Sequence, residues 1–237
     1  MKLLCAGASH IGQVRRNNED AILLRTDERG GLFLVADGIG GREHGELVSA
    51  MLRERYSQWW QDRFLQDPGM SFPDAIGELK GVLLRVNREV VDRFGPLQAG
   101  STLVLLLLMG KNCLYLSAGD SRIYLARRLS FQQVTVDDTV GNSAGAQRQA
   151  DRGKLMGAVG IREQPEFSVR TDTLQKGDRF FLCSDGVYRY LDANRLSRRL
   201  LLGWPQPEQL IQDFSREIEQ NGAGDNYSLI YVRVSGA

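Results

Sequence analysis

Short apolar runs separated by glycines and charged turns dominate this chain. Runs of strand-favouring residues that are bounded by turn residues are typical of buried strands. They cover residues 2–8, 21–26, 32–36, 103–109, 113–118, 123–126, 167–171, 179–183 and 227–234. The connections after residues 109 and 118 are short, so the pattern predicts an antiparallel meander of the three runs between 103 and 126.

Apolar residues recur at helical spacing in three segments, 48–64, 74–94 and 207–220. Each segment places them on one stripe, which is the pattern of a helix packed against a core. Trp59 and Trp60 fall on the first stripe. We therefore interpret both as core residues and not as part of a cofactor site.

Between residues 137 and 164 the hydrophobic periodicity fades, and glycine, serine and glutamine spread through the segment. So long a polar connection in a compact domain is usually functional or mobile, and we predict a flap over the site at about 137–164. No linker rich in proline, serine or glycine divides the 237 residues. We expect a single domain that spans 1–237.

The charge balance and the short apolar runs exclude several classes of function. The chain has 30 basic and 29 acidic residues, whereas a nucleic-acid-binding protein would show a basic excess. The apolar start is too short for a signal peptide, and the longest later run, 103–109, is too short to span a membrane. We expect a cytoplasmic protein that binds neither nucleic acid nor membrane.

The cysteine and histidine content limits the kind of metal site that the chain can form. Cys5, Cys113 and Cys183 are widely separated and lie in apolar segments, so we expect buried free thiols. With only His10 and His44 available, a zinc centre lacks its usual ligands. Any metal ion should therefore be held by oxygen atoms.

The most informative stretch is 32–45, where an apolar run ends at Asp37. Gly38, Gly40 and Gly41 follow closely, and glycine lets the backbone turn tightly and approach a ligand. A carboxylate beside an uncovered backbone carbonyl suits a hard divalent cation, which prefers oxygen ligands. The alternative is an Asp-Gly turn that has no chemical role.

Other acids occupy comparable positions. Asp185 and Asp225 each stand beside a glycine at a strand end, as Asp37 does, and Glu19 and Asp120 lie in turns. Acids gathered at one edge of a sheet repel one another unless cations neutralise them. Two divalent ions would polarise a bridging water and screen the charge of a phosphoryl group, so the predicted chemistry is phosphoester hydrolysis.

Six short motifs follow one another along the chain, R-x-N-N-E-D at 15–20, V-A-D-G-I-G-G at 35–41, G-S-T-L at 100–103, A-G-D-S-R at 118–122, G-D-x-x-x-L-C-S-D-G at 177–186 and D-N at 225–226. In this order they resemble the motifs of the metal-dependent protein phosphatases (PPM, or type 2C serine/threonine phosphatases) in their compact bacterial form. The resemblance covers essentially the whole chain. It implies an α+β four-layer sandwich in which two central antiparallel β-sheets are flanked by α-helices.

The resemblance also implies a set of metal ligands. Asp37 would bridge two Mn²⁺ or Mg²⁺ ions, and the Gly38 carbonyl would bind one of them. Asp185 and Asp225 would complete the coordination of the other ion. Glu19 would act through metal-bound water.

Further roles and two departures follow from the same comparison of motifs. Arg15 would bind the substrate phosphate, for which the planar guanidinium group with its paired N–H donors is well suited. Asp120 would help to bind a third, weaker metal ion. Asp20 is expected to be a structural or second-layer acid. Ile39 stands where animal members carry a histidine proposed as general acid. Arg189 stands where many relatives have another acid for the third metal.

The resemblance implies a Mn²⁺- or Mg²⁺-dependent phosphatase that hydrolyses phosphoserine and phosphothreonine by direct attack of a metal-bridging hydroxide. It further implies that the enzyme reverses a eukaryotic-like bacterial Ser/Thr kinase, with a phosphothreonine-binding scaffold of a secretion system as a further partner, and that it is a monomer. Two alternatives stay open. One is a non-catalytic binding module built on the same fold, and the other is hydrolysis of a small phosphoester.

Overall fold

The structure is a computed structural model that describes residues 1–39, 44–138, 157–202 and 206–236. Its strands are β1 (Lys2–His10), β2 (Asp20–Thr26), β3 (Gly30–Asp37), β4 (Leu103–Met109), β5 (Asn112–Ala118), β6 (Arg122–Arg127), β7 (Ser130–Gln133), β8 (Ser168–Thr173), β9 (Arg179–Cys183) and β10 (Tyr227–Gly236). Its helices are α1 (Gly45–Trp59), which continues into the π-helix η1 (Trp60–Phe64), α2 (Phe72–Phe94), α3 (Asp185–Tyr188), α4 (Ala193–Leu201) and α5 (Pro207–Gln220).

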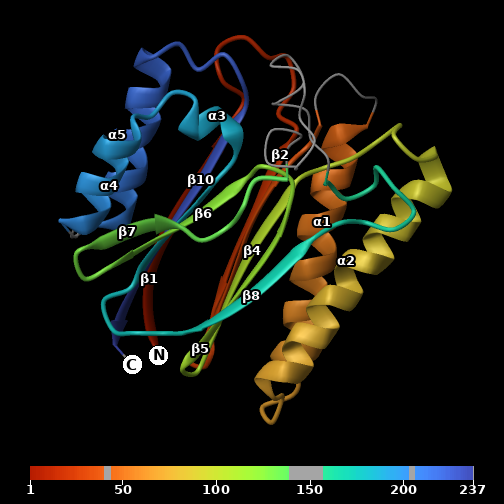
Figure 1. Ribbon diagram of the computed structural model, residues 1–237, viewed down its shortest axis with the longest axis horizontal. Helices are drawn as coiled ribbons and strands as arrows, with labels where there is room; N and C mark the ends of the chain where they lie inside the picture. The colour runs from red at the N-terminus through yellow and green to blue at the C-terminus, as the bar shows by residue number, and fades with distance from the viewer. Residues whose placement is uncertain (40–43, 139–156, 203–205, 237) are drawn as a thin grey trace.

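The strands form two five-stranded antiparallel sheets, ordered β1-β10-β9-β6-β7 and β2-β3-β4-β5-β8. The two sheets face each other, with α1 and α2 outside the second sheet and α4 and α5 outside the first (Figure 1). The predicted four-layer α+β sandwich is therefore confirmed. Among the described helices, none is both long and apolar enough to cross a lipid bilayer.

Strand β3 explains why a continuous apolar run sits at the centre of this architecture. Successive side chains of a strand point to opposite faces of the sheet. Leu32 and Leu34 belong to the core beneath α1 and α2, whereas Phe33 and Val35 belong to the core between the sheets. All four are fully buried, because each face of this strand is covered by another layer.

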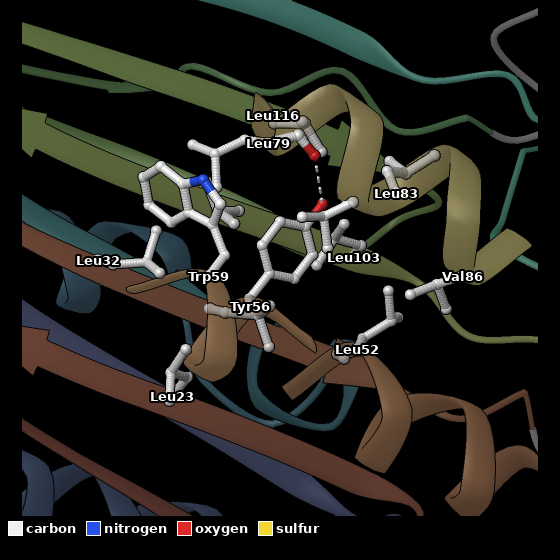
Figure 2. Packing of buried hydrophobic residues seen from close by; sticks show 14 of the residues in the cluster. Leu23, Leu32, Leu52, Tyr56, Trp59, Leu79, Leu83, Val86, Leu103 and Leu116 are labelled. Atoms are coloured by element: carbon white, nitrogen blue, oxygen red, sulfur yellow. Dashed lines mark hydrogen bonds between the residues drawn. The ribbon is translucent and has the colours of Figure 1, made fainter. Parts of the chain in front are cut away.

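The core beneath α1 and α2 confirms the interpretation of the tryptophans. Trp59 and Trp60 are 4% and 2% exposed. Figure 2 shows Trp59 and Tyr56 projecting from α1 among leucines of α2 and the sheet. The Tyr56 hydroxyl is buried and donates a hydrogen bond of 3.2 Å to the carbonyl of Leu79, which satisfies its one polar group.

The prediction that the three runs between 103 and 126 form one antiparallel meander is wrong for the third run, β6. Strands β4 and β5 pair as expected, but β6 lies in the other sheet, between β9 and β7. A short turn need not close a hairpin, and here the turn carries the chain from one sheet to the other. Gly119 makes the passage with φ +98°, and a side chain there would collide with Thr102.

Three elements of the structure, β7, α3 and α4, were not predicted from the sequence. Strand β7 is polar and largely exposed, so it carries no apolar alternation. Helix α3 has only four residues, and α4 buries only Leu196 and Leu200 of its nine. Such short elements form because their neighbours position them, and local periodicity does not reveal them.

Most of the predicted flap at 137–164 falls on 139–156, which lies outside the described residues. The structure describes its two ends. At one end, the Asp138 amide donates to the Gly119 carbonyl at 3.0 Å, and the Gly119 amide donates to the Asp138 carboxylate at 3.2 Å. At the other end, the amides of Val159 and Ser101 each donate to the carbonyl of the other, at 2.9 and 3.0 Å. Both ends are thus fastened to loops beside the cavity described below.

Truncating a residue of the core between the sheets should be costly. Leu106 is fully buried there, and we expect Leu106→Ala to lower the free energy of unfolding by about 2–5 kcal/mol. Leu129 is 93% exposed, and Leu129→Ala should stay within about 0.5 kcal/mol of the wild type. Urea unfolding measures both. Equal losses in the two variants would contradict the assignment of the core.

Candidate metal centre and substrate cavity

The predicted site residues lie around one cavity with a volume of about 210 Å³. It is lined by Arg15, Glu19, Asp37, Gly38, Asp120, Asp185 and Asp225, together with Ile39, Thr102, Arg189 and Asn226. All seven residues expected at the site are therefore in the lining. Their side chains come from segments that are more than 200 residues apart in the chain.

The acids come from both sheets, and not from one sheet edge as the sequence had suggested. Asp37 is the last residue of β3 in the second sheet. Asp185 begins α3 two residues after β9, and Asp225 lies in the loop two residues before β10, so both are positioned by strands of the first sheet. Because β9 and β10 are antiparallel neighbours, the end of one lies beside the start of the other. The cavity lies where these strand ends meet.

Thr102 holds Asp37 in place. Its amide donates to the Asp37 carbonyl at 2.8 Å, and its hydroxyl oxygen accepts from the Asp37 amide at 3.1 Å. The same hydroxyl lies 2.7 Å from that of Ser121, the residue directly before β6 of the other sheet. Thr102 is 2% exposed, and it connects the two sheets at the floor of the cavity.

Asn226 organises the loop that carries Arg15 and Glu19. Its side chain donates to the carbonyls of Ile11 and Asn17, at 2.8 and 2.9 Å, and accepts from the Glu19 amide at 3.0 Å. An amide side chain, which both donates and accepts, is suited to this position. Asn226 and Thr102 both lie in the six sequence motifs, but their residue types alone indicated no role for them.

Gly38 is buried, and the backbone around it leaves no room for a side chain. A Cβ atom there would lie 2.6 Å from the backbone of Gly45 and 2.8 Å from the carbonyl oxygen of Glu19. The Gly38 amide donates to that same Glu19 carbonyl at 3.0 Å. The close approach brings the loop of Glu19 against the end of β3.

Burial and mutual repulsion make ionisation of the acids unfavourable. Burial first, and then the charges of Asp20, Asp185, Asp120 and Asp225, raise the pKa of Asp37 well above its ordinary value. Burial is also the main cause that raises the pKa of Asp20 to about 6 and that of Asp185 to about 6. Asp20 faces Asp37 directly across the pairing of β2 and β3.

Two arginines compensate part of this negative charge. Arg15 binds Asp225 through Nε at 2.8 Å and Nη2 at 3.0 Å. Arg189 binds Asp185 at 2.7 Å, and its Nη1 lies 4.0 Å from Asp225. The carboxylates of Asp185 and Asp225 thus point to guanidinium groups.

Asp120 has a different set of neighbours. Its carboxylate accepts a hydrogen bond of 3.3 Å from the hydroxyl of Tyr188, at the end of α3. The guanidinium of Arg122 stacks 3.5 Å from the centre of the Tyr188 ring and binds the carboxylate of Asp137 at 2.7 Å. Burial raises the pKa of Asp120, and the nearby Asp137 adds to the effect.

The donor atoms around the cavity match divalent cations that prefer oxygen. In the described part of the chain no three Asp, Glu, His or Cys side chains form a group that could hold an ion as they stand. Asp185 and Asp225 turn toward arginines instead. Every acid in the lining nevertheless supplies oxygen donors. Asp20 is not in the lining, but it pairs with Asp37 across β2 and β3, and its Oδ1 is buried with no hydrogen-bond partner among the described residues. Cations such as Mn²⁺ or Mg²⁺ suit this donor set.

Comparison with known proteins agrees with the geometry. The sequence profile of the family described as protein phosphatase 2C matches residues 6–223. The solved structure of PppA, described as a key regulatory component of T6SS in Pseudomonas aeruginosa, is 31% identical, with a TM-score of 0.81 and 98% of both chains covered. The serine/threonine protein phosphatase PstP of Mycobacterium tuberculosis is 28% identical over 246 residues. That match covers 97% of this chain and 44% of PstP, so the chain spans less than half of that relative.

A further structure has the same fold. The catalytic domain of PstP in complex with two manganese ions superposes with a TM-score of 0.80, at 24% identity and with 99% of both chains covered. The resemblance found in the six sequence motifs is thus confirmed by an independent profile over most of the chain. The chain belongs to the protein phosphatase 2C family and is an enzyme of that family.

Proposed function

We propose that the chain, as a single domain, hydrolyses phosphoserine and phosphothreonine in proteins with the help of two Mn²⁺ or Mg²⁺ ions. The observation that carries this proposal is the convergence of Asp37, Asp185 and Asp225 on one cavity from the ends of two sheets. The family supports it, and so do the two manganese ions in the structure of PstP.

The proposed ligands are the carboxylates of Asp37, Asp185 and Asp225 and the carbonyl of Gly38, with Glu19 acting through water. When bound, the two ions would activate water for attack on phosphorus and offset the negative charge of the phosphoryl group. Asp120 would be the ligand of a third ion. The positive charge of Arg189 in the same cavity would make that ion the most weakly held.

The chain's own residues orient the substrate and restrict the path of the proton. Hydrolysis adds water to phosphorus, breaks the bond from phosphorus to the seryl or threonyl oxygen, and requires a proton on that oxygen. Ile39 lines the cavity and has no proton to give, so the proton comes from water or from a carboxyl of the cavity. Arg15, with its planar fork, would bind the phosphate oxygens.

The proposed setting is the cytoplasm, where the enzyme would act as a monomer on the products of a eukaryotic-like Ser/Thr kinase. The free thiols of Cys5, Cys113 and Cys183 support a reducing compartment. The 31% identity to PppA, described as a regulatory component of T6SS, supports a role beside a secretion system, with a phosphothreonine-binding scaffold as a partner.

Removing a proposed ligand should abolish catalysis. We expect Asp37→Asn and Asp185→Asn to lower the hydrolysis of p-nitrophenyl phosphate and of a phosphothreonine peptide by at least about 10³-fold, because each removes a charge that holds the ions. Chelation of the wild type should have the same effect, and added Mn²⁺ should restore it. Asp92→Asn, on the exposed face of α2, is the control and should remain active. Full activity in both site variants would refute the proposal. Cleavage of the small ester alone would favour a small-molecule substrate.

The buried acids predict how stability responds to pH in chelator. Because the pKa values of Asp20 and Asp185 rise to about 6 on folding, the folded state holds protons that the unfolded chain has released. These groups therefore make the protein less stable as the pH rises from about 4 to about 6. Asp37→Asn removes one of the repelling charges, so it should unfold at higher denaturant than the wild type at pH 7, with a difference that shrinks toward pH 4.

Chemical denaturation of the two proteins in parallel measures that difference, since the surface carboxyls cancel between them. Mn²⁺ at pH 7 should stabilise the wild type more than Asp37→Asn, because only the wild type keeps the full set of carboxylates. A wild type that is more stable than Asp37→Asn in chelator at pH 7 would show that repulsion in the cavity is not significant.

The cellular substrates should be phosphoproteins. In a strain that lacks the protein, we expect phosphothreonine and phosphoserine to accumulate on a limited set of proteins, and the same set should accumulate in a strain that carries Asp37→Asn. Quantitative phosphoproteomics compares the two strains with the parent. Phosphorylation that changes only in the deletion strain would indicate that the protein acts through binding instead of hydrolysis.

A further inference from the structure

Arg189 occupies a position in the cavity that its ion pair with Asp185 does not fully explain. It caps the C-terminal end of α3, and its amide donates to the carbonyl of Asp185, the first residue of that helix, at 3.1 Å. Its side chain is 55% exposed and still reaches Asp185 at 2.7 Å. The Asp185 side chain is only 15% exposed, so the pair compensates part of a buried charge, but it does not account for the approach of Arg189 to Asp225.

The guanidinium groups of Arg189 and Arg15 converge on a single atom. Nη2 of Arg15 lies 3.0 Å from Oδ2 of Asp225, and Nη1 of Arg189 lies 4.0 Å from the same oxygen. One arginine comes from the loop before β2 and the other from the end of α3. Both line the cavity, and both are about half-exposed at its mouth.

The carboxylate oxygens of Asp185 and Asp225 cannot bind divalent cations and the two guanidinium groups equally well at the same time. Divalent ions that bind these carboxylates would compete with the arginines for the same oxygens and would repel their positive charge. A half-exposed arginine at a helix end is free to move aside, and its N–H donors would then face the cavity. An anion with several oxygens, such as a phosphoryl group, accepts bonds from two guanidinium groups at once.

The backbone at this point is held firmly enough to direct the side chain. Tyr188, the residue before Arg189, donates its hydroxyl to Asp120, and its ring is covered by the guanidinium of Arg122. Tyr190 follows, and its amide donates to the carbonyl of Val187 at 3.1 Å. These contacts fix the positions of Tyr188 and Tyr190, so the Cα atom of Arg189 between them stays beside the cavity.

We propose that Arg189 is a second phosphate-binding residue, which acts with Arg15 to position the phosphoryl group of the substrate. This inference rests on the proposed function and adds a specificity determinant to it. The matching ligand is the dianionic phosphate of a phosphorylated side chain, or inorganic phosphate as the product. A phosphodiester, which carries a single negative charge, would gain less from two guanidinium groups.

The test compares Arg189→Ala and Arg189→Lys with Arg195→Ala. Arg195 is a matched control, because it is 56% exposed and pairs with Glu217 at 3.1 Å, on α4 and outside the cavity lining. Calorimetry on the Mn²⁺-loaded proteins measures the Kd of inorganic phosphate. Kinetics with a phosphothreonine peptide measure KM and kcat.

We expect Arg189→Ala to raise the Kd of phosphate and the KM of the peptide about tenfold, with a smaller change in kcat. Arg189→Lys should recover part of the loss, because it keeps the charge but not the planar fork. Arg195→Ala should behave as the wild type.

Unchanged phosphate binding in both Arg189 variants would overturn the inference, and a tighter Kd for Mn²⁺ in Arg189→Ala would then identify Arg189 as a counter-ion of Asp185 only. This failure is distinct from that of the proposed function. A wild type that binds phosphate but hydrolyses neither the peptide nor p-nitrophenyl phosphate would refute the proposed function alone, since phosphate binding is measured without turnover.

Discussion

Repulsion among carboxylates that the fold forces together is the constraint on which the rest of the site depends. Asp20, Asp37 and Asp185 would separate if they lay on flexible loops, but Asp20 begins β2, Asp37 ends β3, and Asp185 follows β9 after Ser184. Strand β3 is buried up to Asp37, and β9 is buried from Phe180 to Cys183. The two sheets cannot move these ends apart without opening the core between them. Burial then raises the pKa values of these acids, and the remaining charge is met by arginines at the mouth of the cavity.

The same constraint explains why polar residues with no reactive group are buried around the cavity. A hydrogen bond between the hydroxyls of Thr102 and Ser121 links the two sheets at the cavity, and the side chain of Asn226 binds the backbone of the loop that carries Arg15. Each is less than a tenth exposed and has its hydrogen-bonding groups satisfied by named partners. A network of this kind stays in place only when it is complete, since an unpaired buried polar group is costly. Such a network keeps the acids in register as their charge changes.

Much of this arrangement could be predicted from local sequence. The strand that ends at Asp37 is a continuous apolar run because both its faces are buried, and such a run is visible without any structure. The seven expected site residues do line one cavity. The sheet to which β6 belongs could not be predicted, because a three-residue turn at 119–121 fits a hairpin as well as a crossing. The bond between Tyr188 and Asp120 joins residues 68 positions apart, and no periodicity reports it.

Helix α3 is one turn long, and it carries Asp185 at its start and Tyr188 and Arg189 at its end. A rotation or shift of this turn would therefore displace three side chains together. They are Asp185 among the acids, Tyr188 beside Asp120, and Arg189 at the mouth of the cavity. Because these three residues share one helical turn, a substitution of any one of them in the course of evolution affects the positions of the other two. Affinity for cations and preference among phosphorylated partners should consequently change together whenever this turn is altered.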